Sequence, residues 1–360
     1  MTDRRRKVRP ANPFAREIVA GGVALCQNLT MSQPLSLLVT GAAGFIGARF
    51  VESCNQRDIP VFGVDYRDAF NTRPEHKALK FTRTFDVDEL FENLSDAGTV
   101  AGQKISGIIH MGACSSTTEL NVEFLRRVNI EYSQTLWNFA TRHGLPFVYA
   151  SSAATYGDGD QGYEDDESKT SALRPLNPYG ESKRLFDLWA LEQESRGHAP
   201  PSWSGHKFFN VYGFGERHKA GQASVVLHAF DQIREKGGMK LFKSHKPGVA
   251  DGHQERDFIS VEDVVEVLRF ALEKPIKRGI FNVGTGKART FLDLARATFQ
   301  ALGAPDKIEF IETPEAIRGR YQYFTQATMH KLRAEGYSRP FTSLEEGVAR
   351  YVARLLEISG

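Results

Sequence analysis

The stretch TGAAGFIG, residues 40–47, decides the fold. It follows a short apolar run at residues 35–40 and leads into an amphipathic segment at residues 45–55. An apolar run, a glycine-rich turn and a 3.6-residue pattern predict a buried strand connected tightly to a helix. Such a connection places the N–H groups at the start of the helix where an anion can bind.

The glycines of this stretch have the spacing GxxGxxG, and each has a physical role. Gly41 permits the tight turn, Gly44 lets a pyrophosphate approach the backbone, and Gly47 lets the helix pack closely on the strand. Together with the strand and the helix, the spacing predicts a dinucleotide-binding loop.

An acidic residue ends the next predicted strand, at residues 61–64, and bears on the choice of dinucleotide. Asp65 lies 18 residues after Gly47, where a carboxylate accepts a ribose hydroxyl of NAD. It would repel the 2′-phosphate of NADP unless a cation compensates, and Arg67 and Arg73 are near enough in sequence to do so. The sequence leaves NAD and NADP open.

The chain beyond this loop alternates strand and helix. We expect strands at residues 105–110, 146–151, 207–211 and 279–283, and helices at residues 121–143, 179–196, 224–236, 261–272, 291–301 and 344–358. This alternation predicts an α/β fold, a Rossmann-type doubly wound parallel sheet with a smaller C-terminal α/β substrate lobe. We place a dinucleotide-binding domain at residues 34–209 and the substrate-binding lobe mainly at 210–360, with some of its segments returning to the first domain.

Composition excludes several classes of protein. The 360 residues carry a formal charge of +2, and 41% are hydrophobic and 25% charged, which is typical of a folded chain and gives no reason to expect nucleic acid. The 3 cysteines lack metal-ligand spacing, so we expect reduced thiols, no metal and a cytoplasmic protein. No apolar run is long enough to span a membrane. We expect the basic residues 1–33 to be a disordered extension, with Met31 as an alternative start.

A second motif, YGESK at residues 179–183, opens a predicted helix. Residues four apart share a helical face, so the Lys183 ammonium lies beside the Tyr179 phenol. One cation at about 5 Å stabilises a phenolate by about 3 kcal/mol at an effective dielectric constant of 20, which lowers the pKa of Tyr179 toward neutrality. Tyr179 is therefore our candidate base, and Ser152, at the end of a strand, either hydrogen-bonds the reacting oxygen or caps that strand.

These motifs together resemble the extended short-chain dehydrogenase/reductases that modify nucleotide sugars. More narrowly, the sequence is similar to the ADP-L-glycero-D-manno-heptose 6-epimerases in four segments: HMGACSSTTE at 110–119, ASSAATYG at 150–157, FNVYG at 209–213 followed by His218-Lys219, and GRYQYFTQ at 319–326. The resemblance implies an isomerase that oxidises C6 of an ADP-heptose to a ketone and returns the hydride to the other face from tightly bound NADP. It also implies a homo-oligomer, typically a pentamer, and a role in lipopolysaccharide core synthesis.

The resemblance assigns roles to individual positions. The catalytic residues it implies are Tyr179, Lys219 as a second acid–base group, Lys183 and Ser152. The cofactor-binding residues are Gly41, Gly44, Phe45, Ile46, Gly47, Asp65, Tyr66, Met111, Gly112, Ala113, Cys114, Ser115, Asn129, Lys183, Val211 and Lys219. The substrate-binding residues are Ser152, Asn210, His228, Phe242, Lys243, Ser244, His245, Arg256 and Tyr321.

Other activities of the same superfamily remain alternatives. Sugar 4,6-dehydratases carry an Asp-Glu pair where this chain has Ala153 and Ala154, so elimination of water lacks its acid and base. A UDP-sugar 4-epimerase is the main alternative, and a noncatalytic dinucleotide-binding regulator would not need the Tyr179–Lys183 pair. The sequence departs from the heptose epimerases at Met111, where an acidic residue is expected, and in a longer loop at residues 244–255.

Overall fold

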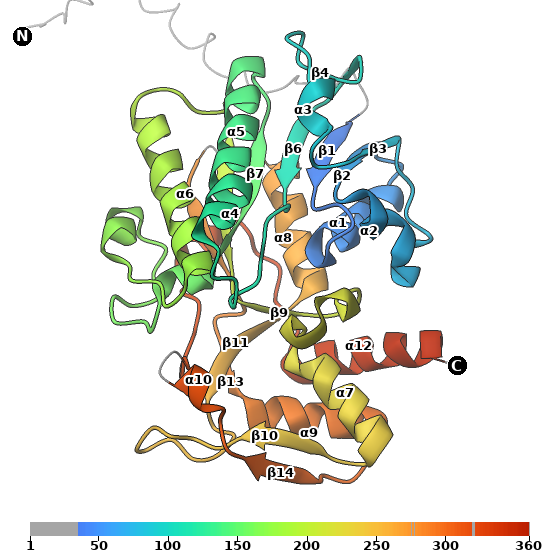
Figure 1. Ribbon diagram of the computed structural model, residues 1–360, viewed down its shortest axis with the longest axis vertical. Coiled ribbons are helices and arrows are strands. Elements are labelled where there is room, and N and C mark those ends of the chain that lie inside the picture. The colour runs from blue at the N-terminus through green and yellow to red at the C-terminus, as the bar shows by residue number, and fades with distance from the viewer. Residues whose placement is uncertain (1–34, 275, 277, 319–320, 360) are drawn as a thin grey trace, which may run out of the picture. The chain divides into compact units, whose positions relative to one another are not determined.

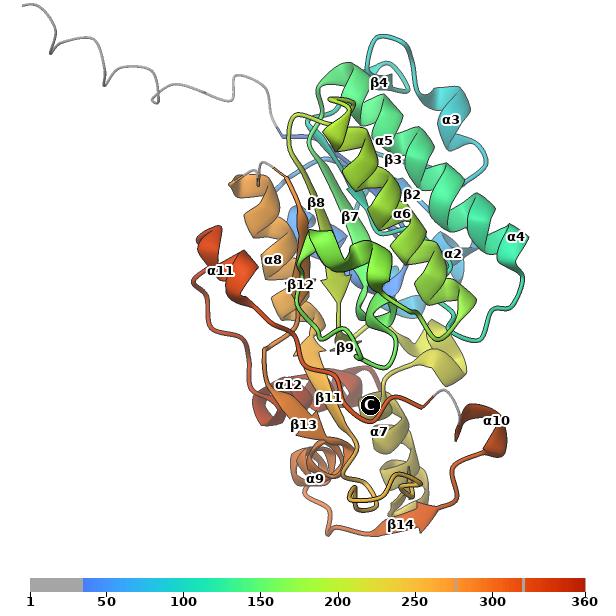
Figure 2. The ribbon, with the colours of Figure 1, turned by 90° about the vertical axis from the view of Figure 1, so that its left-hand side faces the viewer.

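Seven parallel strands form the central sheet of this computed structural model, in the spatial order β12-β8-β7-β6-β1-β2-β3. Figure 1 labels β7, β6, β1, β2 and β3, and Figure 2 labels β8 and β12. The strands are β1 (Leu37–Thr40), β2 (Val61–Val64), β3 (Arg83–Phe85), β6 (Gly107–His110), β7 (Phe147–Ser152), β8 (Trp203–Phe208) and β12 (Ile280–Val283). Most of their residues are buried, as is usual where helices cover both faces of a parallel sheet. The predicted doubly wound α/β sheet is confirmed.

The structure describes residues 35–274, 276, 278–318 and 321–359. The predicted extension at residues 1–33 and the alternative start at Met31 lie outside the described residues. So do Gly319 and Arg320 at the start of the GRYQYFTQ segment. None of the described helices is long and apolar enough to cross a membrane.

Helices lie on both faces of the sheet (Figure 2). On one face, α1 (Phe45–Asn55) packs against α8 (Val261–Glu273). On the other lie α4 (Val122–Leu125), α5 (Tyr132–His143) and α6 (Pro178–Ser195). The aromatic core under α5 and α6 centres on Trp137, whose ring centroid lies 5.1 Å from that of Trp203 and 5.7 Å from that of Phe147.

Short elements connect these parts of the sheet. They are α2 (Arg67–Thr72), η1 (Pro74–His76), α3 (Leu90–Asn93), the antiparallel pair β4 (Thr99–Val100) and β5 (Gln103–Lys104), and the 3₁₀ turns η3 (Ala153–Tyr156) and η4 (Glu167–Ala172). Between α4 and α5 the helix is wound as one π segment, η2 (Arg126–Glu131). The helix predicted at 121–143 thus contains an irregular turn, and it ends where predicted, at Gly144, whose φ is +63°.

The predicted strand at residues 207–211 is wrong in its bounds. The structure has two separate strands there: β8 ends at Phe208, and β9 (Asn210–Tyr212) belongs to another sheet. The physical reason is that β8 buries the polar side chains of Ser204 and His206, so residues 203–206, which the prediction missed, do not have the apolar pattern of a buried strand.

The remaining elements form a second region around two small sheets. One sheet has the order β13-β11-β9 and the other pairs β10 with β14. Their elements are η5 (Arg217–Gln222), α7 (Val225–Lys236), β10 (Met239–Phe242), β11 (Glu255–Ser260), β13 (Ala288–Thr290), α9 (Phe291–Leu302), β14 (Ile308–Ile311), α10 (Glu315–Arg318), α11 (His330–Ala334) and α12 (Leu344–Ser359). Because β12 lies beside β8 in the central sheet, the chain returns to that sheet after β11. The predicted division at residue 209 stays a prediction.

Candidate active site

The glycine loop joins β1 to α1 and is too tightly packed for side chains at two of its positions. Gly41 has a φ of +65°, and a Cβ there would lie 2.6 Å from the backbone nitrogen of Gly112. A Cβ on Gly47 would lie 2.0 Å from the carbonyl oxygen of Gly41. Among the described residues no side chain caps the start of α1, and its first turn contains no acidic residue. The loop therefore has the geometry and the positive helix terminus that a dinucleotide pyrophosphate requires.

Asp65 follows β2, and its side chain is hydrogen-bonded to this loop. Its carboxylate accepts hydrogen bonds from the backbone N–H groups of Ala43 at 2.9 Å and of Tyr66 at 2.8 Å. Burial raises the pKa of Asp65, and these N–H groups and the charge of Arg73 oppose that rise. The Arg73 guanidinium also donates to the carbonyl of Ala43, so a cation lies at the same loop.

The segment after β6 is fixed to the helices by Asn129, which lies in the π turn η2 and has no exposed surface. Its side-chain oxygen accepts from the Cys114 N–H at 2.9 Å, and its amide nitrogen donates to the Cys114 carbonyl and to the Ser182 hydroxyl. Asn129 thus ties residues 111–115 to helix α6. Single-turn π segments are frequent at functional sites, which agrees with this position.

Tyr179 and Lys183 lie on the first turns of α6. The helix begins where Asn177 accepts from the N–H of Gly180 at 2.8 Å and where Pro178 occupies a first-turn position that needs no donor. Both side chains are buried, Tyr179 at 8% exposure and Lys183 at 6%. Ser152, at the end of β7, hydrogen-bonds Tyr179 and also accepts from the N–H of Ala154 at 3.1 Å. The structure thus brings three of the four predicted catalytic residues together.

The expected lowering of the pKa of Tyr179 by Lys183 is not found. Burial raises the pKa of Tyr179 above its ordinary value, and the hydrogen bond from Ser152 opposes this. The Lys183 ammonium instead donates to the carbonyl of Ala150 at 2.9 Å, and burial lowers the pKa of Lys183 to about 8. A charged amine held by a backbone carbonyl of β7 has less effect on the phenol than the spacing alone suggests.

Lys219, the fourth predicted catalytic residue, lies in η5 at the glycine loop. Its half-buried ammonium lies 5.5 Å from the ring centroid of Phe45, a cation–π distance. Burial lowers the pKa of Lys219, which is the direction that an acid–base role requires, and Glu216 opposes that shift. On its other side the η5 turn contacts the 110–119 segment, where the amide of Gln222 pairs with the hydroxyls of Thr117 and Thr118 at 3.4 Å.

Sequence reasoning missed Glu216, which organises the turn that carries Lys219. Glu216 has no exposed surface, and its carboxylate accepts from Gly213 N–H at 3.2 Å and from both the N–H and the hydroxyl of Ser224 at 2.6 Å. These hydrogen bonds connect the residues on the two sides of the turn, Gly213 and Ser224. Ala220, directly after Lys219, has a φ of +46°, a strained conformation for a residue with a Cβ. The sequence offered one signal for this role, an acidic residue, Glu216, three positions before Lys219.

The predicted substrate-binding residues divide into two groups. Arg256 is buried, and its guanidinium lies 5.6 Å from the ring of Tyr321, whose ring in turn lies 6.4 Å from that of Phe242. The backbone N–H of His245 donates to the hydroxyl of Tyr323 in the same segment at 3.1 Å.

The other predicted substrate-binding residues do not contact the Arg256–Tyr321 cluster through any of the interactions described above. Lys243 forms an ion pair with Glu312 at 2.9 Å at the surface, and Ser244 donates its N–H to Asp251. His228 is half-buried on α7, and Asn210 is exposed on β9. Their contacts to a substrate stay predictions.

A catalytic pairing of Cys114 with His110 does not fit the geometry. His110 is buried, its ring nitrogens pair with Thr40 at 2.6 Å and Ser133 at 2.8 Å, and burial lowers its pKa to about 3. Burial also raises the pKa of the Cys114 thiol. A neutral, fully bonded imidazole and a protonated thiol support a packing role for both residues.

Comparison with known proteins finds relatives that match most of this chain. Residues 37–284 match the model of the NAD dependent epimerase/dehydratase family. An ADP-L-glycero-D-manno-heptose-6-epimerase of Fusobacterium nucleatum is 45% identical over 333 residues, which cover 89% of this chain and 98% of that relative.

Solved structures show the same relationship. The Helicobacter pylori ADP-L-glycero-D-manno-heptose-6-epimerase superposes with a TM-score of 0.73 at 25% identity, covering 89% of this chain and 96% of that one. The Thermus thermophilus UDP-glucose 4-epimerase, solved with NAD, has a TM-score of 0.69 at 26% identity and covers 89% of this chain and 99% of its own.

Proposed function

The chain belongs to the NAD dependent epimerase/dehydratase family and, within it, to the ADP-L-glycero-D-manno-heptose-6-epimerases, and from this we propose that it inverts C6 of ADP-D-glycero-D-manno-heptose. The observation that carries the proposal is the placement of its acid–base groups. Tyr179 lies with Ser152 at the end of β7, while Lys219 lies at Phe45 on the glycine loop. Two separate proton-transfer groups suit a reaction in which the reacting oxygen changes direction.

The residues present fit a bound nicotinamide dinucleotide. Gly41 and Gly47 lie too close to neighbouring backbone atoms to carry a Cβ, which keeps the connection from β1 to α1 tight, and no side chain of the described residues caps the start of α1. A bound nicotinamide dinucleotide would supply a reversible acceptor for the hydride of C6. We propose that the glycine loop, Asp65 and the 111–115 segment hold this cofactor.

The chain's own residues move the protons. Tyr179 removes the proton of the C6 hydroxyl as the hydride leaves, with Ser152 hydrogen-bonded to the same oxygen. The C6 ketone lies outside the sugar ring, so a single bond can rotate and present its other face. Lys219 then returns a proton to the oxygen in its second orientation, because partial burial lowers its pKa toward the range that general acids need. Tyr179 and Lys219 exchange these roles in the reverse direction.

We propose NADP as the preferred cofactor because a cation accompanies the carboxylate at the ribose position. Arg73 donates to the carbonyl of Ala43 and lies close enough to Asp65 to affect its pKa. The guanidinium can pair with a 2′-phosphate that Asp65 would otherwise repel. Replacing Arg73 by Gln should weaken NADPH binding at least tenfold and leave NADH binding within twofold, measured by nucleotide fluorescence. Equal losses for both nucleotides would favour NAD.

The reaction can be tested by incubating the purified chain with ADP-D-glycero-D-manno-heptose in deuterium oxide. We expect the L-glycero diastereomer to form without deuterium at C6, because the same hydride returns. Deuterium at C6 would indicate removal of a proton from carbon instead. Absence of conversion, with turnover of UDP-glucose, would favour the 4-epimerase alternative that structural neighbours share.

The resemblance of the sequence also supports three broader proposals. The product would serve lipopolysaccharide core synthesis, the enzyme would act in the cytoplasm, and it would assemble as a homo-oligomer, typically a pentamer.

A further inference from the structure

A buried ion pair includes a residue of α6, the helix that also carries Tyr179 and Lys183. This pair takes no part in the proton transfers proposed above. The Lys207 ammonium on β8 lies 2.8 Å from the carboxylate of Asp187 on α6, and their side chains are only 3% and 0% exposed. Removing two charges from water costs several kcal/mol per ion, and a pair of this kind is often no more stable than apolar side chains of the same size. Its presence therefore needs a reason besides stability.

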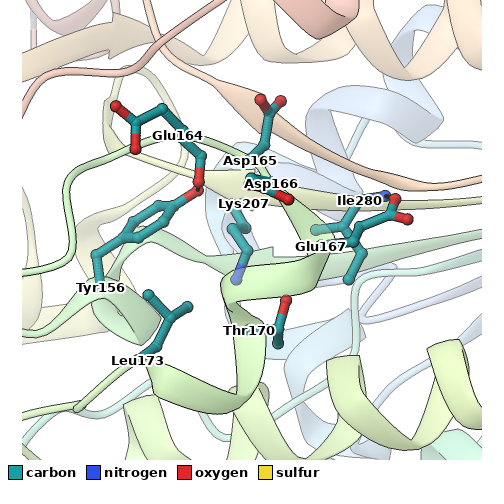
Figure 3. Close-up of a pocket in the computed structure, with 9 residues that line it drawn as sticks. All are labelled: Tyr156, Glu164, Asp165, Asp166, Glu167, Thr170, Leu173, Lys207 and Ile280. Atoms are coloured by element: carbon teal, nitrogen blue, oxygen red, sulfur yellow. Dashed lines mark hydrogen bonds between the residues drawn. The ribbon is translucent and has the colours of Figure 1, made fainter.

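Both charges are fully engaged by hydrogen bonds. Asp187 accepts from the hydroxyl of Tyr149 at 3.0 Å and from that of Ser151 at 2.8 Å. Lys207 donates to the Thr155 hydroxyl at 2.6 Å and lies 5.1 Å from the ring centroid of Tyr156. Figure 3 shows the Lys207 side chain among Tyr156, Leu173 and Thr170, below the acidic turn at residues 164–167. The pair is fixed from both sides.

Asp187 links the ion pair to Tyr179 and Lys183 through its position on helix α6. Tyr179, Lys183 and Asp187 follow one another at intervals of four residues, so they share one face of α6. Their partners are consecutive residues of β7: Tyr149 and Ser151 bond Asp187, the Ala150 carbonyl bonds Lys183, and Ser152 bonds Tyr179. Asp187 thus fixes the face of α6 against β7 at the point where Lys183 and Tyr179 are held.

Three titratable groups among the described residues interact electrostatically with Lys183: Asp187 on α6, Cys114 in the segment after β6 and His110 on β6. Tyr179 lies one helical turn before Lys183 on α6, and Lys207 on β8 is the ion-pair partner of Asp187. Burial lowers the pKa of Lys183 to about 8, and Asp187 is the strongest influence that raises it again. How much of Lys183 is charged near neutral pH therefore depends on Asp187.

We propose that Asp187, held by Lys207, is a positioning residue that keeps the Lys183 ammonium charged and in place beside Tyr179. The inference rests on the proposed function only in taking Tyr179 and Lys183 as the reacting pair. It assigns the buried pair to the control of catalysis at alkaline pH.

The direct test follows the titration of Lys183 itself, which needs no substrate. Lysine labelled with ¹³C at Cε reports its protonation by NMR, and a Lys183→Arg sample identifies the signal. In Asp187→Asn we expect the pKa of Lys183 to fall by about one pH unit, because a nearby carboxylate is lost. In Lys207→Met we expect it to rise, because the carboxylate is then uncompensated. The alkaline limb of kcat should move in the same two directions, with KM for the nucleotide sugar changed less than twofold.

A matched control separates this effect from simple loss of structure. Asp263, on α8, is also a buried carboxylate that accepts two hydrogen bonds, from the N–H of Thr342 at 2.8 Å and its hydroxyl at 3.1 Å. Asp263→Asn should lower Tm and leave the titration of Lys183 unchanged.

An unchanged Lys183 pKa in Asp187→Asn, or the same shift in the Asp263 variant, would overturn the proposal. If Asp187→Asn does not fold, a Lys207→Met variant whose Lys183 titrates as in the parent protein would overturn it equally. The pKa of Lys183 could shift in opposite directions in Asp187→Asn and Lys207→Met although the parent protein converts no ADP-heptose. That result would support the role given to Asp187 and reject the proposed substrate.

Discussion

Tyr179 and Lys219 have different surroundings although both are proposed to move protons. Tyr179 is buried among α6 and β7 with Ser152 as its hydrogen-bonding partner, whereas Lys219 is half-buried on a turn that Glu216 closes. Burial raises the pKa of the phenol and lowers that of the amine, so both move away from the values they have in water. Tyr179 therefore needs its partners to reach a useful pKa, whereas burial alone moves the pKa of Lys219 in the useful direction.

Removing either acid–base group should abolish inversion while cofactor binding survives. We expect Tyr179→Phe and Lys219→Met each to lower kcat by about 10²–10⁴-fold, the usual contribution of a general acid or base. NADPH affinity, followed by fluorescence, should change less than threefold in Tyr179→Phe. Lys240→Met, which removes an exposed lysine paired with Glu309, is the control and should keep full activity. Near-normal turnover in the Lys219 variant would remove the two-base mechanism.

The sequence could name the candidate reacting residues but not the contacts that hold them. The spacing of Tyr179 and Lys183 follows from the helix itself, so a local pattern contains it. Asn129, Asp187 and Glu216 act through residues 15 or more positions away or through both ends of a turn, and such contacts exist only in the folded chain. For the same reason the sequence could not show that Lys183 donates to Ala150.

At the scale of elements, the β1–α1 connection depends on close backbone contact. Gly47→Ala would place a Cβ against the carbonyl of Gly41, so the start of α1 must move. We expect a loss of about 1–3 kcal/mol in the free energy of unfolding, as for overpacked sites, and at least tenfold weaker NADPH binding.

Gly107→Ala, on the adjacent strand β6, is the matched control for that change. Its added Cβ would meet its nearest neighbour at 3.5 Å, an ordinary contact. Urea unfolding and nucleotide titration of both variants would decide, and equal effects would contradict the role given to Gly47.

The π turn η2 makes a second prediction at this scale. Asn129→Ala removes three buried hydrogen bonds, to Cys114 twice and to Ser182 once, at about 1 kcal/mol each. We expect about 3 kcal/mol lower stability by urea unfolding and a lower kcat, because the 111–115 segment is no longer tied to α6. Asn71→Ala, an exposed asparagine on α2, should change neither quantity. A fully active and stable Asn129 variant would contradict this.

Elements with a strong helical period could be predicted closely, and polar buried elements could not. The bounds predicted for α1 agree with the structure because its apolar face repeats along the whole helix. The start of strand β8 could not be predicted because His206 and Lys207 are buried with polar partners, which the pattern of residues does not reveal. The π turn has the same sequence period as an α-helix over so short a length.

For the whole molecule, three buried histidines predict sensitivity to acid. Burial lowers the pKa of His76, His110 and His206 to about 3 each, so all three are neutral in the folded chain near pH 5. The unfolded chain binds protons on these residues below about pH 6.5. Their contribution to stability is therefore complete above that pH and is lost as the pH falls toward 3.

The expected size is on the order of 1 kcal/mol per histidine for each pH unit below 6. Urea unfolding at pH 7.5, 6.5 and 5.5 measures it. A His206→Asn variant should show a shallower decline over this range than the parent chain, and an unchanged slope would mean that this histidine does not contribute.

Strand β12 has a consequence for the newly made chain. Residues 280–283 complete a sheet whose other six strands lie before residue 209. During synthesis, the edge of β8 that pairs with β12 thus keeps its backbone N–H and C=O groups unpaired until some 70 further residues have left the ribosome. A fragment that ends at residue 209, the predicted domain boundary, should therefore aggregate through this edge, and a chaperone or slower translation of residues 210–279 should raise the yield of folded protein.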